Sequence, residues 1–413
     1  MSQTIAEKII SQHAGYPVRA GDIAIVPVDG AMATDTTAPL AIQAFRAMGG
    51  QHLWDSARFW LVLDHATPAP NERIANLHNL MRQFAGETGC RLYDVGAGIC
   101  HQLMIEHDHV RPGDIFTGAD SHTPTYGAVG AFAVGMGSTD LAAVMLTGQT
   151  WLKVPHTIKI ELNGRLPAGV SAKDVILYLV GRLGISGATY EAVEFTGKAV
   201  AGLTLASRMT LANMVAEMGA KTGVVDTSGL SLPYSFAPVF PDQGAAYRAI
   251  HVVDVSALRP QIALPHAPDN VVDIDAALGQ KVQMAFIGSC TNGRLEDWQA
   301  AAQVLQGRKI APGVRLIMAP ASKTVFNAAL RDGTAAILSE AGATFITSGC
   351  GPCVGTHQGV PGNGEAVISS TNRNFRGRMG NPNAQVYLAS PSVVSAAAVA
   401  GDIIDPQALW ERS

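Results

Sequence analysis

Short apolar runs alternate with amphipathic stretches along most of the chain. Residues 59–63 form a continuous apolar run, which is typical of a strand buried on both faces. Residues 71–85 follow with their apolar positions at helical spacing. The same alternation resumes beyond residue 279, after an irregular, proline-rich stretch over 227–269. Strands that alternate with helices in this way predict an α/β protein.

Two changes in this pattern predict domain boundaries. The pattern of predicted strands and helices changes around residues 151–154, and regular alternation of strands and helices returns only after the irregular stretch over 227–269. A chain of 413 residues is long enough to form several hydrophobic cores. We therefore expect three α/β domains, which span residues 1–153, 154–280 and 281–413.

Composition narrows the class of protein. The chain has 43 glycines and only 6% aromatic residues, which suits many tight loops between strands and helices. Its 29 basic and 33 acidic residues nearly balance and form no basic run, so we expect no nucleic-acid partner and no membrane association. No signal peptide is recognisable, and five cysteines make no disulfide framework, so we expect a cytoplasmic protein.

Polar residues that can carry chemistry follow the predicted strands. In α/β sheets, ligands bind at the carboxyl ends of strands, so these residues are expected to meet at one site. They are Asp64, His65, His101, Asp120, Ser121, His122, Cys290, Cys350, Asn372 and Arg373.

Three of the five cysteines, Cys290, Cys350 and Cys353, are candidate metal ligands. Three thiolates can hold a soft metal centre and leave one coordination position open for chemistry. Three other interpretations stay open on these residues alone. They are a zinc site completed by His357, a thioredoxin-like redox motif in the Cys-Gly-Pro-Cys sequence at 350–353, and simple burial as small packing residues.

The histidines after the strands are candidate acid–base groups. An imidazole held by a carboxylate is a good proton donor or acceptor near neutral pH. Any one of them could be structural, but three in equivalent places favour function as a set. The candidates are His65, His101 and His122, with Asp64, Asp120 and Glu194 as possible orienting carboxylates.

Three segments carry a strong resemblance to a known family: FIGSCTNGR at 286–294, GCGPCVG at 349–355 and STNRNFRGR at 370–378. Residues 98–102, 120–123 and 213–223 agree with it as well. In this order, over essentially the whole chain, they resemble the aconitase superfamily, and within it the large subunits of 3-isopropylmalate dehydratases. The resemblance implies three α/β/α domains around an iron–sulfur cluster, without the mobile swivel domain of one-chain members.

The resemblance also implies roles for individual residues. It implies a [4Fe–4S] cluster with one open iron, held by three cysteine ligands, whereas Cys90 and Cys100 match no ligand position. The implied ligands are Cys290, Cys350 and Cys353. The implied catalytic pairs are Asp64 with His65, Asp120 with His101, and Glu194 with His122. The implied substrate-binding residues are Ser121, Asn292, Asn372, Arg373 and Arg378, of which the two arginines suit a bidentate grip on carboxylates.

The implied activity is that of a hydro-lyase. It would interconvert 2-isopropylmalate and 3-isopropylmalate, in leucine biosynthesis, by removing water and adding it back. Homoaconitase, or a dehydratase of another 2-substituted malate, is the alternative within the family. A non-catalytic, RNA-binding iron–sulfur protein and a dithiol oxidoreductase are the alternatives from other classes.

A partner is expected as well. One-chain relatives continue into the swivel domain, which supplies a serine base and a further arginine, whereas this sequence ends at Ser413. We therefore expect a small subunit that carries the swivel domain, in a heterodimer or heterotetramer, and a di- or tricarboxylate substrate.

Overall fold

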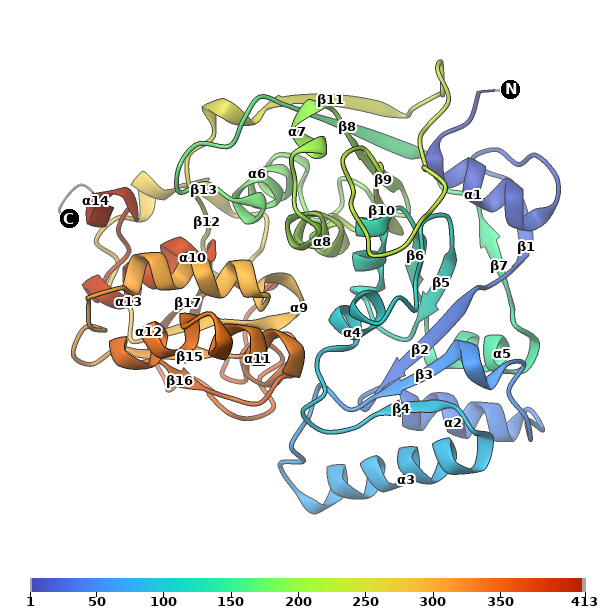
Figure 1. The fold of residues 1–413 in the computed structure, drawn as a ribbon, viewed down its shortest axis with the longest axis horizontal. Coiled ribbons are helices and arrows are strands. Elements are labelled where there is room, and N and C mark those ends of the chain that lie inside the picture. The colour runs from blue at the N-terminus through green and yellow to red at the C-terminus, as the bar shows by residue number, and fades with distance from the viewer. Residues whose placement is uncertain (1, 411–413) are drawn as a thin grey trace.

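The computed structural model describes residues 2–410, and its strands form three mainly parallel sheets and one two-stranded ribbon (Figure 1). The predicted α/β class is confirmed. The ribbon pairs β1 (Ile23–Pro27) with β7 (Gln149–Lys153) in antiparallel fashion, beside the first helix, α1 (Ile5–Ala14). That helix begins with a capping box between Thr4 and Glu7, as its sequence favours.

The first sheet has five parallel strands in the order β4-β3-β2-β5-β6. All four residues of β3 (Phe59–Val62) are buried, as the apolar run predicts. The helix that follows begins after Asn71, whose side chain accepts from Ile74 N, and ends at a left-handed Gly89. The other elements are β2 (Gly30–Thr34), β4 (Arg91–Tyr93), β5 (Ile115–Gly118), β6 (Phe132–Gly135), α2 (Ala38–Ala47), α3 (Glu72–Thr88), α4 (Cys100–Glu106) and α5 (Ser138–Thr147).

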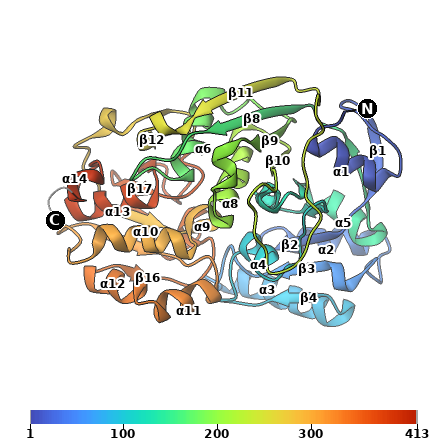
Figure 2. The same ribbon diagram turned by 45° about the horizontal axis from the view of Figure 1, so that its top comes forward.

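The second sheet has four parallel strands in the order β10-β9-β8-β11. Helix α8 (Leu205–Met214) is followed directly by a 3₁₀ turn, Val215–Met218. In Figure 2, the irregular segment that leads to β11 passes in front of β10, and its Asp242 bonds Gln3 and Lys8 near the N-terminus. The elements are β8 (Thr157–Asn163), β9 (Ala192–Thr196), β10 (Thr222–Val225), β11 (Ala249–Asp254), α6 (Ala172–Leu183), α7 (Lys198–Ala201) and α8 (Leu205–Met214).

The third sheet has seven strands in the order β13-β12-β18-β17-β14-β15-β16, and β12 runs antiparallel to both neighbours. Because β12 and β13 pair here, the third sheet takes strands from before residue 280; the domain boundaries themselves stay predictions. The elements are β12 (Gln261–Ala263), β13 (Val271–Asp273), β14 (Met284–Ile287), β15 (Arg315–Met318), β16 (Thr344–Phe345), β17 (Ala366–Ser369), β18 (Gln385–Leu388), α9 (Ser289–Asn292), α10 (Leu295–Leu305), α11 (Lys323–Arg331), α12 (Thr334–Ala341), α13 (Pro391–Ala400) and α14 (Gln407–Trp410).

One hydrophobic core joins the three sheets. It contains Phe116 of β5, Ile160 of β8 and Phe286 of β14. Neighbouring residues on β5 and β14 point the other way and enter two further cores, one for the first sheet and one for the third. The shared core therefore fixes the three sheets against one another.

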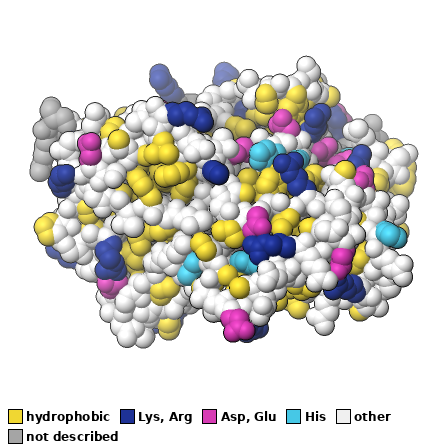
Figure 3. Space-filling view, turned by 60° about the horizontal axis from the view of Figure 1, so that its bottom comes forward, with side chains coloured by type: hydrophobic (Ala, Val, Ile, Leu, Met, Phe, Trp, Pro, Cys, Tyr) yellow, Lys and Arg dark blue, Asp and Glu magenta, His cyan; other side chains and the backbone are white. Residues whose placement is uncertain are grey.

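The exposed surface is mixed in character. On the face in Figure 3, lysine and arginine side chains are dispersed among acidic, apolar and neutral ones. Among residues 2–410, no helix has both the length and the apolar character that crossing a membrane requires.

Candidate active site

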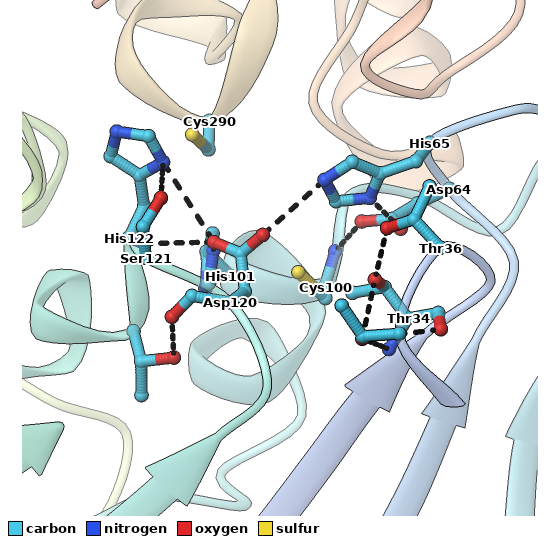
Figure 4. A network of polar contacts seen from close by, with 12 residues as sticks. Thr34, Thr36, Asp64, His65, Cys100, His101, Asp120, Ser121, His122 and Cys290 are labelled. Atoms are coloured by element: carbon cyan, nitrogen blue, oxygen red, sulfur yellow. Dashed lines mark hydrogen bonds and ion pairs between the residues drawn. The ribbon is translucent and has the colours of Figure 1, made fainter. Parts of the chain in front are cut away.

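The polar residues that follow the first-sheet strands converge on one place. Asp64 and His65 follow β3, and Asp120 and His122 lie just beyond β5. His101 comes from the first turn of α4. Figure 4 shows the rings of His65 and His122 on either side of the Asp120 carboxylate, with Cys290 facing them. These five acidic and histidine residues are called the histidine side below.

Asp120 is the centre of the histidine side. Its Oδ1 lies 2.7 Å from His101 Nε2 and accepts the backbone N–H of His122 at 2.8 Å. Its Oδ2 lies 3.3 Å from His65 Nε2. Burial opposes the negative charge, but the two imidazoles outweigh it, so the pKa of Asp120 lies well below its ordinary value. One carboxylate thus orients two rings.

His65 is held from behind by its neighbour. Its Nδ1 donates to Asp64 Oδ1 at 2.7 Å, while Asp64 Oδ2 accepts the backbone N–H of Cys100 at 2.7 Å. Burial alone would lower the pKa of His65, but Cys350 and the two carboxylates raise it well above its ordinary value. The predicted pairs Asp64–His65 and Asp120–His101 therefore occur as contacts in the structure.

The third predicted pair is wrong. His122 Nε2 lies 2.9 Å from Glu217 Oε1, and Arg373 Nε donates to both oxygens of the same carboxylate, at 3.0 and 2.9 Å. Arg373 also donates to Ser121 Oγ at 3.1 Å. Burial alone would raise the pKa of Glu217. His122 and Arg373 lower it by more than burial raises it, so the pKa of Glu217 lies below its ordinary value.

Glu194, the predicted partner of His122, lies elsewhere. Its carboxylate accepts the backbone N–H of Ile5 at 2.9 Å and the hydroxyl of Tyr247 at 2.6 Å. Burial raises its pKa. Glu217, which belongs to the 3₁₀ turn after α8 and was not among the predicted site residues, occupies the expected place. It lies within residues 213–223, which already carried the resemblance, and that was the signal available.

The three predicted ligand cysteines line the opposite side of the site, called the cysteine side. Cys290 belongs to α9, directly after β14, and Cys350 and Cys353 belong to a loop with a short 3₁₀ turn, Gly351–Cys353. All three are buried. Ser289 adopts a left-handed φ of 73°, and this tight turn between β14 and α9 presents Cys290 toward the histidines.

The thiols have mostly neutral partners. Cys290 Sγ accepts from the side-chain amides of Asn213 at 3.2 Å and Asn372 at 3.5 Å, and Arg378 Nη2 lies 3.7 Å from Cys353 Sγ. Burial raises the pKa of Cys290 well above its ordinary value. Burial also raises the pKa of Cys350 to about 11, although His65 opposes the shift.

Both sides enclose one cavity of about 240 Å³. Of the predicted substrate-binding residues, Ser121, Asn372, Arg373 and Arg378 line it. Asn292 does not: its amide donates to Asp297 at 2.9 Å behind α9. The cavity is lined by Thr36, His65, His101, Asp120, Ser121, His122, Cys290, Cys350, Cys353, Val354, Thr356, Asn372, Arg373 and Arg378.

The spacing of the thiols bears on what they could hold. Among the described residues, one group of three possible metal ligands has its ligand atoms within 4.8 Å of one another, and it consists of Asp64, His65 and Cys350. The sulfurs of the three cysteines do not form such a group. Sulfurs that share one tetrahedral zinc ion lie about 4 Å apart. His357, moreover, is engaged with Thr356 and the carbonyl of Thr67. The cysteine side therefore suits a larger soft centre and not the zinc site with His357.

Buried thiols opposite carboxylate–imidazole pairs define a class of α/β protein that can combine a soft metal centre with acid–base chemistry. Comparison with known proteins agrees. The model of the aconitase family (aconitate hydratase) matches residues 7–401. The chain belongs to the aconitase family, and membership of this family implies an iron–sulfur cluster. Membership of this family replaces the thioredoxin-like interpretation of residues 350–353.

Relatives match over nearly the full length. The chain is 47% identical over 415 residues to 3-isopropylmalate dehydratase large subunit 1 of Methanopyrus kandleri, covering 98% of this chain and 99% of that one. It is also 47% identical over 415 residues to the homoaconitase large subunit of Thermus thermophilus, covering 100% and 99%. The holo-form structure of aconitase X from Thermococcus kodakaraensis has a similar fold, with a TM-score of 0.52 at 13% identity over 91% of this chain and 94% of that one.

Proposed function

We propose that this chain is the large subunit of an iron–sulfur hydro-lyase that interconverts 2-isopropylmalate and 3-isopropylmalate. The observation that carries the proposal is the single cavity in which three buried thiols face three ordered histidines. Full-length identity to dehydratase large subunits supports the same conclusion.

In this proposal Cys290, Cys350 and Cys353 hold a [4Fe–4S] cluster through three of its irons. When bound, such a cluster would supply Lewis-acid chemistry toward the substrate hydroxyl. The amide donors of Asn213 and Asn372 at Cys290 fit this role, because N–H groups directed at sulfur stabilise a thiolate ligand.

His65 is the proposed acid for the leaving hydroxyl. Its Nδ1 donates to Asp64, which stabilises the protonated ring, and its Nε2 faces Asp120 across the cavity. Both rings have partners at both nitrogens, but His101 Nε2 lies 2.7 Å from Asp120 and its Nδ1 3.2 Å from the Tyr126 hydroxyl, whereas His65 Nε2 makes the longer contact to Asp120, at 3.3 Å. We therefore assign to His101 the role of holding Asp120, and to His65 the transfer of the proton in both directions.

The arginines are proposed to hold substrate carboxylates. Glu217 fixes Arg373 through Nε, which leaves part of the guanidinium facing the cavity. Arg378 lines the same cavity beside Cys353. A guanidinium held in one orientation can bind a carboxylate through two parallel hydrogen bonds.

We propose that a small subunit with the swivel domain completes the site, in a heterodimer or heterotetramer. The relatives are named as large subunits, which implies a smaller partner. Among the described residues that line the cavity, Asp120 is the only carboxylate, and it is already bonded to His101. The base that takes the proton from the neighbouring carbon is therefore assigned to the partner.

Homoaconitase activity is the second candidate, because the homoaconitase large subunit is as similar as the dehydratase. The test is anaerobic reconstitution of the chain with iron and sulfide, followed by assay with small subunits of both kinds. Turnover of isopropylmalate well above that of cis-homoaconitate supports the proposal. The reverse preference selects the second candidate, and a reconstituted complex that turns over neither rejects both.

A further inference from the structure

A carboxylate outside the cavity organises the turn that carries His65. Asp35 directly follows β2, is only 3% exposed and does not line the cavity. Its Oδ1 accepts the backbone N–H groups of Asp64 at 3.3 Å and His65 at 2.8 Å. Its Oδ2 accepts that of Ala66 at 2.8 Å. Three successive amides thus point at one side chain.

Asp35 is itself fixed from two directions. Its backbone N–H donates to the carbonyl of Val62 at 3.0 Å, and His78 of α3 places Nε2 3.3 Å from Oδ2. Burial opposes the charge, but His78 and the backbone donors lower the pKa of Asp35 to about 2. The group is therefore an anion under working conditions, bonded to strand β3, to α3 and to the turn.

The turn also contacts the cysteine loop. The carbonyl of Asp64 accepts the backbone N–H of Cys350 at 2.7 Å, and Thr356 Oγ1 donates to the carbonyl of His65 at 3.2 Å. A Cβ at Gly349 would lie 2.7 Å from the Asp64 carbonyl oxygen, so the two segments are in close contact. A shift of the turn would therefore move His65 relative to the cysteines.

We propose that Asp35 is a positioning residue for the dehydration, and that its bonds to the amides of residues 64–66 set the direction in which the His65 ring points into the cavity. The proposal rests on the proposed function. Asp35 acts through the turn that carries His65, because it does not itself line the cavity. If the His65 ring points in another direction, the rate of proton transfer falls, whereas the arginines still bind the substrate.

The test is Asp35→Asn in the reconstituted complex with the small subunit. Asparagine keeps the size but places an N–H₂ group against backbone N–H donors. We expect kcat to fall by about tenfold or more with KM within about twofold of wild type. Iron and sulfide content should be unchanged.

Asp29→Asn is the matched control. Asp29 lies at the other end of β2, pairs with His13 Nε2 at 2.8 Å and accepts the backbone N–H of Ile115 at 2.8 Å. It is the same kind of aspartate–histidine pair in the same sheet, away from the cavity. We expect its kcat and KM to equal those of wild type. Equal losses in both variants, or a kcat for Asp35→Asn within twofold of wild type, would overturn the proposal.

Hydrogen–deuterium exchange gives a readout that needs no turnover. In a peptide covering residues 60–70, Asp35→Asn should exchange faster than wild type and Asp29→Asn should not. If the wild-type complex shows no dehydratase activity, the proposed function fails, while unchanged exchange in Asp35→Asn separately rejects the anchoring of the turn. His78→Gln removes one partner of Asp35 and should also lower kcat, by about threefold. This variant replaces Asp35→Asn as the test if Asp35→Asn does not fold.

Discussion

The two sides of the cavity are built on different principles. On the histidine side, each ring contacts a carboxylate of the chain, and Asp120 is held ionised by His101 and His65. On the cysteine side, the thiols have amide neighbours, and burial raises the pKa of Cys290 and Cys350. The chain therefore orders the acid–base groups by itself, whereas buried thiols become thiolates when a positive centre binds them.

Removing a thiol should have the largest effect, because the cysteine side depends on a bound centre. We expect Cys290→Ser to lose the absorption of the reconstituted cluster and to lower kcat by about a thousandfold or more. Cys90→Ser, a buried cysteine outside the cavity, is the control and should keep both. Full cluster absorption in Cys290→Ser would show that this thiol is not a ligand.

The next effect separates two buried glutamates. Glu217→Gln removes the charge that orients His122 and Arg373, and kcat should fall by about a hundredfold. Glu194→Gln keeps an acceptor oxygen for the backbone N–H of Ile5, and its N–H₂ group can donate to the Tyr247 hydroxyl, so kcat should change by less than about threefold. Steady-state kinetics of the two variants side by side is the measurement. Similar losses in both would restore a catalytic role for Glu194.

Arg373→Lys tests geometry rather than charge. Lysine keeps the positive charge but cannot bind Glu217 through Nε and still present a planar fork to a carboxylate. We expect KM to rise about tenfold with a smaller change in kcat. Arg376→Lys in the same loop is the control, because Arg376 is exposed, lies outside the cavity lining and donates to the carbonyl of Pro382 at 3.4 Å. An unchanged KM in Arg373→Lys would exclude it from substrate binding.

The smallest expected effect is on the free energy of unfolding, through Asp297, which bonds Asn292 behind α9. Burial raises the pKa of Asp297 to about 6, in contrast to the lowered pKa of Asp120. The folded state then binds more protons than the unfolded state between pH 3.8 and 6, so this stabilisation is complete below pH 3.8 and is lost as pH rises through 6. Urea unfolding at pH 5 and pH 7.5 should show wild type losing about 1.4 kcal/mol more than Asp297→Asn, which corresponds to about one pK unit. Equal pH dependence would show that Asp297 is ionised throughout.

Much of the fold and the site followed from the sequence. The apolar run at 59–63 and its polar end predicted both β3 and the position of His65. The predicted pairing of Glu194 with His122 was wrong for a physical reason. All five residues of β9 are buried, so the pattern of apolar and polar residues along the strand does not show which way the Glu194 carboxylate points. Glu217 lies in the 3₁₀ turn after α8, and nothing in the local sequence pattern marks it as a residue that faces a histidine from another sheet.

Other features lie beyond local patterns altogether. Asn292 sits in a motif next to Cys290, yet the turn of α9 directs its amide away from the cavity, to Asp297. Asp35 belongs to no motif, because its importance comes from backbone amides that are 29 to 31 positions away along the chain. Contacts of that kind depend on how sheets pack, which spacing along one strand does not record.

The bond between Thr356 and the carbonyl of His65 joins positions 291 residues apart. During synthesis at roughly 5–20 residues per second, the segment around His65 leaves the ribosome about 15–60 s before its partner. The first sheet can fold in that interval, but the cavity cannot close before the last cysteine has appeared. A cofactor held by all three cysteines would therefore assemble late relative to the first sheet, and a nascent chain released before Cys290 would carry the histidines of that sheet with no thiols opposite them.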